Sequence, residues 1–393
     1  MKHSILDKTR MNLNKSKYQS PDVLFYAEDP GAANYIVHLP AVCKEKGLSS
    51  VAIAAGRAKE FFKEHDVPFE DISGSGTPLA ILQRLAPNLV VVGTSENPGS
   101  PGLNFVEEAR SKGIPTVGVV DAFMNAFYRF RGYTDDAMAY APNWLIIPDE
   151  WTKREFVDLG FPEKRAVVCG HPQYDFVREK ANELELKDKT ALRSHFFPEA
   201  PEGKLVAIFA AEISDGLNPD QFLLSKEYTL FGRGGSEKRT DIVVEELLEA
   251  MALLPERPYL VLRLHPKNKP SEFAGYMEEF DQISREQPVL DMIFASDCVI
   301  GMTSMLLLEA AILGRPTFSI VPKKRERDWL PSVQAGLTMC ASTREELQTL
   351  LPFFFQEVSA GKWKSPDDIF IFGAAQKSCE LLKNIISYSL RKE

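Results

Sequence analysis

The chain has 393 residues, of which 44% are hydrophobic and 26% are charged. This length is too great for one ordinary core, so we expect about two domains with the composition of a soluble globular protein. The formal net charge of -9 argues against a general nucleic-acid binder, because such proteins usually carry a basic surface.

Residues 1–20 are polar, contain several lysines and lack the apolar core of a signal peptide. No apolar run in the chain approaches the roughly 18 residues that a transmembrane helix needs. We therefore expect a cytoplasmic protein with a disordered basic arm. Because the arm is basic and the rest of the chain is acidic, it could also make a peripheral contact with anionic membrane lipid.

Short apolar runs alternate with helical stretches along the next part of the chain. Several runs are apolar throughout, which is typical of parallel strands covered on both faces. Strands are predicted at residues 22–27, 50–54, 88–93, 115–120, 144–148 and 166–169. Helices are predicted between them, at residues 32–46, 58–65, 78–85, 104–112 and 152–159. We interpret residues 21–175 as one Rossmann-like α/β domain.

A second domain follows a change in composition. Residues 176–202 are charged, are predicted to be helical and end in a Pro-containing stretch, so we interpret them as the passage between domains. The strand and helix pattern resumes over residues 203–369, and an amphipathic helix occupies residues 370–393. The Gly-rich residues 215–238 are typical of an active-site loop or lid. Two doubly wound domains place their ligands at the carboxyl ends of their strands, and facing domains would form a cleft.

Two carboxylates follow the first predicted strand. Glu28 and Asp29 precede Pro30 and Gly31, where Asp29 suits a helix cap and Gly31 lets a ligand approach the backbone. The stretch lacks the glycine spacing of a dinucleotide-binding fingerprint. It is either a capped turn or a substrate site. In the second interpretation one of the carboxylates is a base, and Gly31 and Asn34 contact the substrate.

Polar residues also follow two later strands. Ser95 and Glu96 enter a Pro- and Gly-rich loop, which is either polar surface or a set of ligand contacts. Asp121 lies just past a strand, where burial in a crevice would raise its pKa as a general base requires. The alternatives for Asp121 are a helix cap and a structural ion pair. Arg129 could pair with it or bind an anion, and Asn125 is a further candidate substrate contact.

His171 lies just before the passage between the domains. This position is as consistent with a structural histidine as with a ligand contact.

Basic residues end a strand of the second domain. Arg263, His265 and Lys267 together favour the binding of an anion such as phosphate. The alternative is a strand end with solvated lysines.

An apolar helix carries hydroxyl residues at its start and a carboxylate inside. Thr303 and Ser304 follow a short strand, and backbone N–H groups with hydroxyls at a helix N-terminus suit a phosphate. Glu309 is costly to bury unpaired, which favours a partner such as ribose hydroxyls. The alternative is a capped helix with a buried glutamate. We see no metal-ligand set and no sign of a tightly bound cofactor.

In this order, the residues resemble the second domain of sugar-nucleotide enzymes with the GT-B fold. The likeness is nearest to UDP-N-acetylglucosamine 2-epimerase-like proteins, with related features in capsule glycosyltransferases and CDP-glycerol glycerophosphotransferases. Its most specific parts are residues 170–175, 265–266 and 301–316. The resemblance implies an N-terminal acceptor domain and a C-terminal nucleotide-sugar domain, with the last helix returning to the first domain. It also implies that the hydroxyls of residues 303 and 304 hold the diphosphate and that residue 309 binds ribose.

Two departures from that family bear on the reaction. Hydrolysing epimerases carry Gly-Asp-Thr where this chain has residues 93–95, Gly-Thr-Ser. They carry a His-Arg pair where this chain has residues 210–214, Ala-Ala-Glu-Ile-Ser. We therefore predict a metal-independent glycosyltransferase acting on a cell-envelope or capsule acceptor, with Asp121 as the first candidate base. The alternatives are an epimerase or hydrolase, a CDP-polyol phosphotransferase, and a sugar-nucleotide-binding protein without turnover. The base, sugar, acceptor, stereochemical outcome and oligomeric state stay open.

Overall fold

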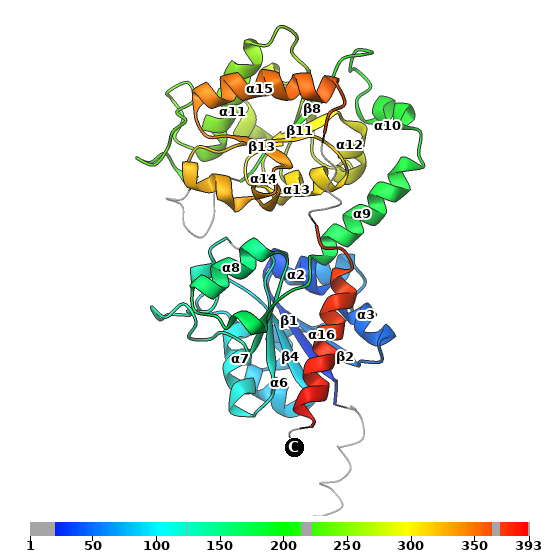
Figure 1. Cartoon of the computed structure of the whole chain (residues 1–393), viewed down its shortest axis with the longest axis vertical. Helices are drawn as coiled ribbons and strands as arrows, with labels where there is room; N and C mark the ends of the chain where they lie inside the picture. The colour runs from blue at the N-terminus through cyan, green and yellow to red at the C-terminus, as the bar shows by residue number, and fades with distance from the viewer. Residues whose placement is uncertain (1–19, 123, 214–221, 364–369, 392–393) are drawn as a thin grey trace, which may run out of the picture. The chain divides into compact units, whose positions relative to one another are not determined.

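A computed structural model describes residues 20–122, 124–213, 222–363 and 370–391 (Figure 1). The predicted basic arm therefore lies almost wholly outside the described residues, as does the first part of the predicted Gly-rich loop. The chain divides into two compact units. Unit 1 comprises Met1–Asp175 and Ile371–Glu393, and unit 2 comprises Phe176–Phe370.

Unit 1 is built on a parallel sheet of seven strands in the order β3-β2-β1-β4-β5-β6-β7. The strands are β1 Val23–Ala27, β2 Ser50–Ala54, β3 Glu70–Asp71, β4 Leu89–Gly93, β5 Thr116–Val119, β6 Trp144–Ile147 and β7 Ala166–Val168. Every residue of β1 and β4 is buried, because helices cover both faces of the sheet at its centre.

The helices of unit 1 form two layers. Residues of α2, α3, α4 and α16 pack on one face of β1, and residues of α6 and α7 pack on the other. The helices are α2 Pro30–Ile36, α3 Leu39–Glu45, α4 Ala58–Glu64, α5 Ile72–Ser75, α6 Pro78–Leu85, α7 Pro101–Ser111, α8 Glu150–Asp158 and α16 Ala374–Ser389, with short 3-10 turns η1 Ala126–Tyr128 and η2 Glu163–Arg165.

The single helix predicted over residues 32–46 is wrong, because the structure has α2 and α3 there instead. Pro40 explains the break. Proline has no N–H to donate to the carbonyl four residues earlier, and its ring clashes with that carbonyl. The residue four positions before Pro40 is Ile36, at which α2 ends.

The motif at residues 170–175 fastens the start of α16 within unit 1. The Asp175 carboxylate accepts the backbone N–H groups of Gly373 and Ala374, at 2.6 and 2.7 Å. Gly170 has a φ of +89°, and a side chain there would collide with the carbonyl of Ile371. Its own carbonyl accepts the Tyr35 hydroxyl at 2.8 Å. The motif therefore has a structural role in this chain.

Unit 2 has a parallel sheet of six strands in the order β10-β9-β8-β11-β12-β13. The strands are β8 Val206–Ala210, β9 Tyr259–Arg263, β10 Gln282–Ser284, β11 Cys298–Gly301, β12 Thr317–Ile320 and β13 Thr338–Ala341. The helices are α9 Pro172–Glu185, which starts at the end of unit 1, α10 Lys189–Phe196, α11 Arg239–Ala252, α12 Val289–Ala295, α13 Met305–Ile312, α14 Pro331–Gln334 and α15 Arg344–Ser359, with 3-10 turns η4 Pro270–Phe273, η5 Met277–Glu279 and η6 Lys324–Trp329.

Both sheets reverse their strand order at one place, which confirms the predicted doubly wound fold. In unit 1 the chain goes from β1 outward to β2 and β3, and then returns to the other side of β1 with β4. In unit 2 the same happens at β8 and β11. Ligands of such sheets bind outside the carboxyl ends of the strands at this switch point. None of the helices in the described ranges is both long enough and apolar enough to cross a membrane.

Candidate functional site

The switch point of unit 1 gathers several of the predicted site residues. Glu28 and Asp29 follow β1, Ser95 and Glu96 follow β4, and Asp121 follows β5. The carboxyl ends of these three neighbouring strands form one edge of the sheet. The fold therefore brings together side chains that lie more than ninety residues apart in the sequence.

Arg129 organises the centre of this crevice. Its Nη1 lies 3.1 Å from Asp121 Oδ1 and donates a second hydrogen bond to Thr94 Oγ1, also at 3.1 Å. The Arg129 side chain is 8% exposed and that of Asp121 is 21% exposed, so the ion pair is partly shielded from water. Asp121 also lies against Gly31, where any side chain would collide with its second carboxylate oxygen. The predicted alternative of an ion pair thus describes Asp121 as the structure has it.

Asp29 differs from Asp121 in its surroundings. Burial raises the pKa of Asp29, and a hydrogen bond from Ser95 opposes that rise. Its neighbour Glu28 is 9% exposed and accepts the Tyr26 hydroxyl at 2.9 Å with Oε2. The other oxygen, Oε1, is buried without a hydrogen-bond partner among the described residues. Buried acceptors are usually satisfied, so this oxygen marks a place for a ligand hydroxyl or water.

The remaining predicted contacts of unit 1 lie around this crevice. Asn125 has a left-handed backbone with a φ of 58°, and its side-chain amide donates to Glu96 Oε1 at 2.9 Å. Asn34 lies half-buried on α2. The Ser95 hydroxyl accepts the backbone N–H of Asn97 at 3.1 Å, which fixes the loop after β4.

His171 is enclosed within unit 1. It is 4% exposed, stacks on Tyr174 with ring centroids 5.0 Å apart, and meets the edge of Tyr35 at 4.8 Å. Burial lowers its pKa to about 4, so the ring is neutral at physiological pH. Since Nδ1 accepts the N–H of Gln173 at 3.1 Å, the proton of the neutral ring is on Nε2.

The switch point of unit 2 holds a buried charge cluster that contains one predicted site residue, Thr303. Glu212, just beyond β8, accepts the Thr303 N–H at 2.5 Å and its hydroxyl at 3.1 Å. Arg239 lies 2.8 Å from Glu212 and 2.7 Å from Glu326. Arg239 and Glu326 are 2% and 1% exposed, so two carboxylates share one guanidinium away from water.

Glu212 occupies the hydrogen-bond donors of the predicted phosphate site. A bound phosphate would take the N–H and hydroxyl of Thr303, and in this structure a carboxylate takes both. Our sequence reasoning did not include Glu212 or Arg239 in the site. The signal for Glu212 was present, because it stands where the resembling epimerases carry their His-Arg pair.

Two other predicted nucleotide contacts belong to α13 and its N-cap. Ser304 is the N-cap of this helix, and its hydroxyl accepts the N–H of Leu306 at 3.2 Å. Glu309 is half-buried on the same helix instead of fully enclosed in the core. The environment of α13 is therefore compatible with polar ligand groups at its first turn and along the face that carries Glu309.

The predicted basic group after β9 is dispersed. Arg263 is 9% exposed, and its guanidinium donates to Ser284 at 2.8 Å and to the Gln287 carbonyl at 3.0 Å. These bonds hold the Arg263 guanidinium against the neighbouring strand β10 and the turn after that strand. His265 accepts the N–H of Lys267 at 3.2 Å. The exposed Lys267 lines a small cavity of about 180 Å³ that Glu212 also borders.

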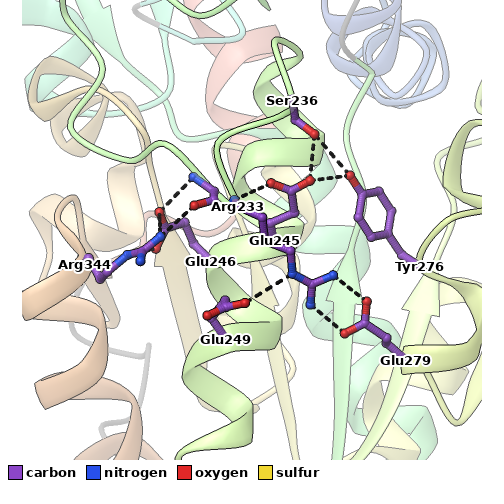
Figure 2. A network of polar contacts seen from close by, with 9 residues as sticks. Arg233, Ser236, Glu245, Glu246, Glu249, Tyr276, Glu279 and Arg344 are labelled. Carbon is purple, nitrogen blue, oxygen red and sulfur yellow. Dashed lines mark hydrogen bonds and ion pairs between the residues drawn. The ribbon is translucent and has the colours of Figure 1, made fainter.

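A clamp of acidic residues on α11 holds the loop at residues 231–236, part of the predicted Gly-rich loop (Figure 2). Glu246 accepts the N–H groups of Phe231 and Gly232, at 3.1 and 2.9 Å, and pairs with Arg344 at 2.8 Å. Glu245 accepts the N–H of Arg233 at 2.6 Å.

The second carboxylate of the clamp, Glu245, has further partners. The hydroxyls of Ser236 and Tyr276 donate to it at 2.6 and 2.8 Å (Figure 2). Arg233 reaches out from the loop to Glu249 and Glu279. Residues 231–236 are therefore anchored to the body of unit 2. The sequence shows no sign of this anchoring, because the Gly-rich loop has no periodic pattern.

No protein-family model matches this chain. Over 179 residues, which are 45% of the chain, it is 26% identical to the teichoic acid poly(glycerol phosphate) polymerase of Staphylococcus epidermidis. The match covers 22% of that protein, so the chain spans about a fifth of the length of this relative.

Solved structures resemble the chain over nearly its whole length. The UDP-GlcNAc 2-epimerase of Neisseria meningitidis bound to UDP-GlcNAc matches 92% of this chain and 99% of its own, with a TM-score of 0.64 and 14% identity. The wall teichoic acid polymerase TagF matches 95% and 91%, with a TM-score of 0.53 and 15% identity. The chain has the GT-B fold. The GT-B enzyme UDP-GlcNAc 2-epimerase of Methanocaldococcus jannaschii, in complex with UDP-GlcNAc and UDP, agrees over 93% of this chain and 99% of its own, with a TM-score of 0.61 and 16% identity.

Proposed function

We propose that this GT-B chain is a glycosyltransferase that uses a nucleotide-activated sugar to build a cell-envelope or capsule polysaccharide in the cytoplasm. The observation that carries the proposal is the pair of polar switch points on a GT-B fold. Unit 1 offers carboxylates and hydroxyls beside Arg129, and unit 2 offers hydroxyls and N–H groups at the start of α13. The first suits a hydroxyl acceptor and the second suits a diphosphate.

Unit 2 would bind the donor. Thr303 and Ser304 would hold the diphosphate at the N-terminus of α13, and Glu309 would accept the ribose hydroxyls. A helix N-terminus stabilises the negative charge that develops on a leaving diphosphate, because its N–H groups are already oriented. The donor would first have to displace the Glu212 carboxylate from Thr303. The proposal includes no metal ion and no tightly bound cofactor.

Unit 1 would bind and activate the acceptor. In this step the acceptor oxygen forms a bond to the anomeric carbon, the bond from that carbon to the diphosphate oxygen breaks, and a base takes the hydroxyl proton. We assign the base to Asp29 before Asp121. Burial raises the pKa of Asp29, which makes it the better proton acceptor, whereas Asp121 is paired with Arg129 at 3.1 Å. Asp121 would then orient the acceptor.

The pH dependence of turnover tests this assignment. A base works only when deprotonated, so turnover falls as the pH drops through the pKa of Asp29, which burial places above the ordinary value of 3.8. This fall is the acidic limb of the pH profile. Asp29→Asn should lower kcat by roughly 10²-fold or more and abolish the acidic limb. Asp121→Asn should lower turnover but keep the limb. An unchanged limb in Asp29→Asn would return the base to Asp121 or Glu28.

A second candidate function is transfer of a polyol phosphate from a CDP-polyol. The match to a poly(glycerol phosphate) polymerase and the likeness to TagF favour it. A thermal-shift panel of UDP, CDP, GDP, ADP and dTDP separates the two, because a ligand that binds only the folded state raises the melting temperature. A shift with CDP alone, followed by release of CMP from CDP-glycerol, would replace the glycosyltransferase proposal.

A third candidate is epimerisation or hydrolysis of the sugar nucleotide, favoured by the whole-length likeness to UDP-GlcNAc 2-epimerases. It predicts product from the donor alone. A glycosyltransferase consumes the donor only when the acceptor is present, apart from slow hydrolysis. Binding of nucleotide without consumption of any donor would instead indicate a protein without turnover.

A further inference from the structure

Unit 1 contains a cavity of about 710 Å³ that the proposed function does not use. It lies beside Pro115 and Trp144, where β5 and β6 begin. This is the amino edge of the parallel sheet, opposite the edge that carries Asp29 and Asp121. The cavity therefore cannot belong to the acceptor crevice. Its volume falls within the range of about 300–1,000 Å³ that is usual for small-molecule sites.

The charged side chains that line this cavity are all cationic. They are Arg110 at the end of α7 and Lys164 and Arg165 on η2, and none of the described lining residues is Asp or Glu. No ion pair is formed by these three cations within the described part of the chain, and the nearby Glu163 lies 3.7 Å from Lys153 instead. In a chain of net charge -9, such a group selects for an anion.

Two of the cations are held in place by uncharged partners. Arg110 Nη2 donates to the Ala141 carbonyl at 2.6 Å, and the Arg165 guanidinium lies 6.0 Å from the centre of the Trp144 ring. Neither contact neutralises the charge. The guanidinium groups are thus oriented beside the cavity and keep their attraction for an anion.

The part of the lining that comes from α16 is mostly apolar, with Asn384 and Ser389 as its polar members. Leu381, Ile385 and Tyr388 form an apolar wall, and Trp144 and Ile114 continue it toward the sheet. A free phosphate would leave this wall unused, and a purely apolar ligand would leave the cations unused. We propose that the cavity binds a phosphate-bearing amphiphile, with the phosphate at the cations and the apolar part against α16.

The position of the cavity favours a membrane lipid as the source of this amphiphile. Tyr388 and Leu390, at the end of α16, are 61% and 58% exposed, as is common where a protein surface meets lipid headgroups. The chain also enters unit 1 at this edge, because Val23 is the first residue of β1. The sequence before that point, residues 1–20, carries the lysine-rich arm, whose charge suits an anionic bilayer.

Calorimetry with a short-chain lipid tests the cavity on the full-length protein. The probe is dihexanoyl phosphatidylglycerol, kept below its critical micelle concentration so that each molecule is monomeric. The variant is Lys164→Glu with Arg165→Glu, and both sites are exposed, so the fold should tolerate the change. The matched control is Lys44→Glu with Lys63→Glu, two lysines on α3 and α4 that lie outside the cavity lining and undergo the same change of charge.

We expect the wild type and the control to bind the lipid equally and the cavity variant to bind at least about tenfold more weakly, because two carboxylates would replace two of the three cations that face the phosphate. Dihexanoyl phosphatidylcholine has the same phosphate but a choline cation beside it, so it should bind more weakly than the phosphatidylglycerol, and glycerol 1-phosphate should bind at least about tenfold more weakly than the lipid. Equal loss in the control, or no binding by the wild type, would overturn the proposal. Equal affinity for glycerol 1-phosphate would also overturn it, because the site would then take a free phosphate and not a lipid.

Vesicles provide the second arm of the test. When vesicles of phosphatidylglycerol and phosphatidylcholine are sedimented, the wild type and the control should be retained in the vesicle pellet. A large share of the cavity variant should stay in the supernatant. Since all three proteins keep residues 1–20, the difference reports on the cavity and not on the basic arm. Retention of all three to the same extent would exclude the cavity as a membrane contact.

Discussion

At the proposed donor site, Glu212 would compete with a diphosphate for the same hydrogen-bond donors. It holds both donors of Thr303 that a phosphate would need. It also gives Arg239 a second carboxylate, although Glu326 already pairs with that guanidinium at 2.7 Å. Two carboxylates thus share the Arg239 guanidinium at the place where an anion should bind, with Lys323 as a further buried cation near Glu326.

Removing this carboxylate should tighten nucleotide binding. In Glu212→Ala the Thr303 donors become available, and Arg239 keeps its pair with Glu326. A hydrogen bond to a charged group is worth about 1.5–3 kcal/mol, so we expect the Kd for UDP or CDP to fall at least about tenfold. Isothermal titration calorimetry measures it.

Two further variants make this experiment decisive. Glu256→Ala removes an exposed carboxylate of unit 2 and should leave the affinity unchanged. Glu212→Gln keeps part of the contact with Thr303 and should lie between the wild type and Glu212→Ala. If the wild type binds nucleotide and Glu212→Ala binds it no better, the carboxylate does not compete with the diphosphate. If no protein binds any nucleotide, the proposed function itself fails.

At the scale of residues, the sequence predicts the position of a site residue better than the orientation of its side chain. Side chains after buried strands were predictable, because the carboxyl ends of parallel strands converge. The structure places Asp29, Asp121 and Thr303 after the ends of β1, β5 and β11, as this pattern predicts. The orientation of a side chain depends on contacts that the sequence does not display. Arg263 therefore looked like an anion ligand although Ser284, on another strand, accepts its hydrogen bond.

At the scale of elements, the acidic clamp on α11 should matter for the stability of unit 2. Glu246 is 2% exposed and accepts two backbone N–H groups of the loop at residues 231–236. Its removal leaves those N–H groups without their acceptor and leaves Arg344 with only the Gly232 carbonyl, at 2.7 Å, as an acceptor among the described residues. We expect Glu246→Ala to lower the free energy of unfolding of unit 2 by about 2–3 kcal/mol.

Glu249 provides the matched control on the same helix. Its side chain is 47% exposed and makes one ion pair with Arg233 at 3.2 Å. Glu249→Ala should therefore cost less than about 1 kcal/mol. Urea unfolding followed by Trp329 and Trp363, with Trp144 and Trp151 replaced by Phe, reports on unit 2. Similar losses in the two variants would show that the clamp does not anchor the loop.

The clamp also predicts the direction of acid sensitivity. Burial alone would raise the pKa of Glu245, but hydrogen bonds from Ser236, Arg233 and Tyr276 together lower it below the ordinary value of 4.5. A carboxylate with a lowered pKa stabilises the folded state above its unfolded pKa. This contribution is lost as the pH falls from about 4.5 through the lower folded value.

Element prediction succeeded where periodicity was strong and failed where elements were short. The buried strands β1, β4 and β8 have continuous apolar runs that a sequence displays directly. The edge strands β3 and β10 have two and three residues, too few to show any period. They form because a neighbouring strand offers its free edge, which is a tertiary effect and not a local one.

At the scale of the whole molecule, the two units have separate hydrophobic cores. Among the described residues, the core cluster of unit 2 is built from residues of that unit, and one of the three clusters of unit 1 combines its first part with α16. A ligand that binds one unit should then stabilise that unit alone. The four tryptophans divide evenly, with Trp144 and Trp151 in unit 1 and Trp329 and Trp363 in unit 2.

Thermal unfolding with nucleotide should therefore show two transitions, of which only the one in unit 2 moves. At a ligand concentration of 100 times Kd the gain is about 2.7 kcal/mol, which corresponds to roughly 5–10 °C for a domain of this size. The comparison uses two proteins, each with the tryptophans of one unit replaced by Phe, heated with and without UDP or CDP. Glu309→Ala, which removes the proposed ribose contact, should lose most of the shift. A shift of equal size in both units would mean that the cores unfold together or that both bind the nucleotide, and the assignment of the donor to unit 2 would then fall.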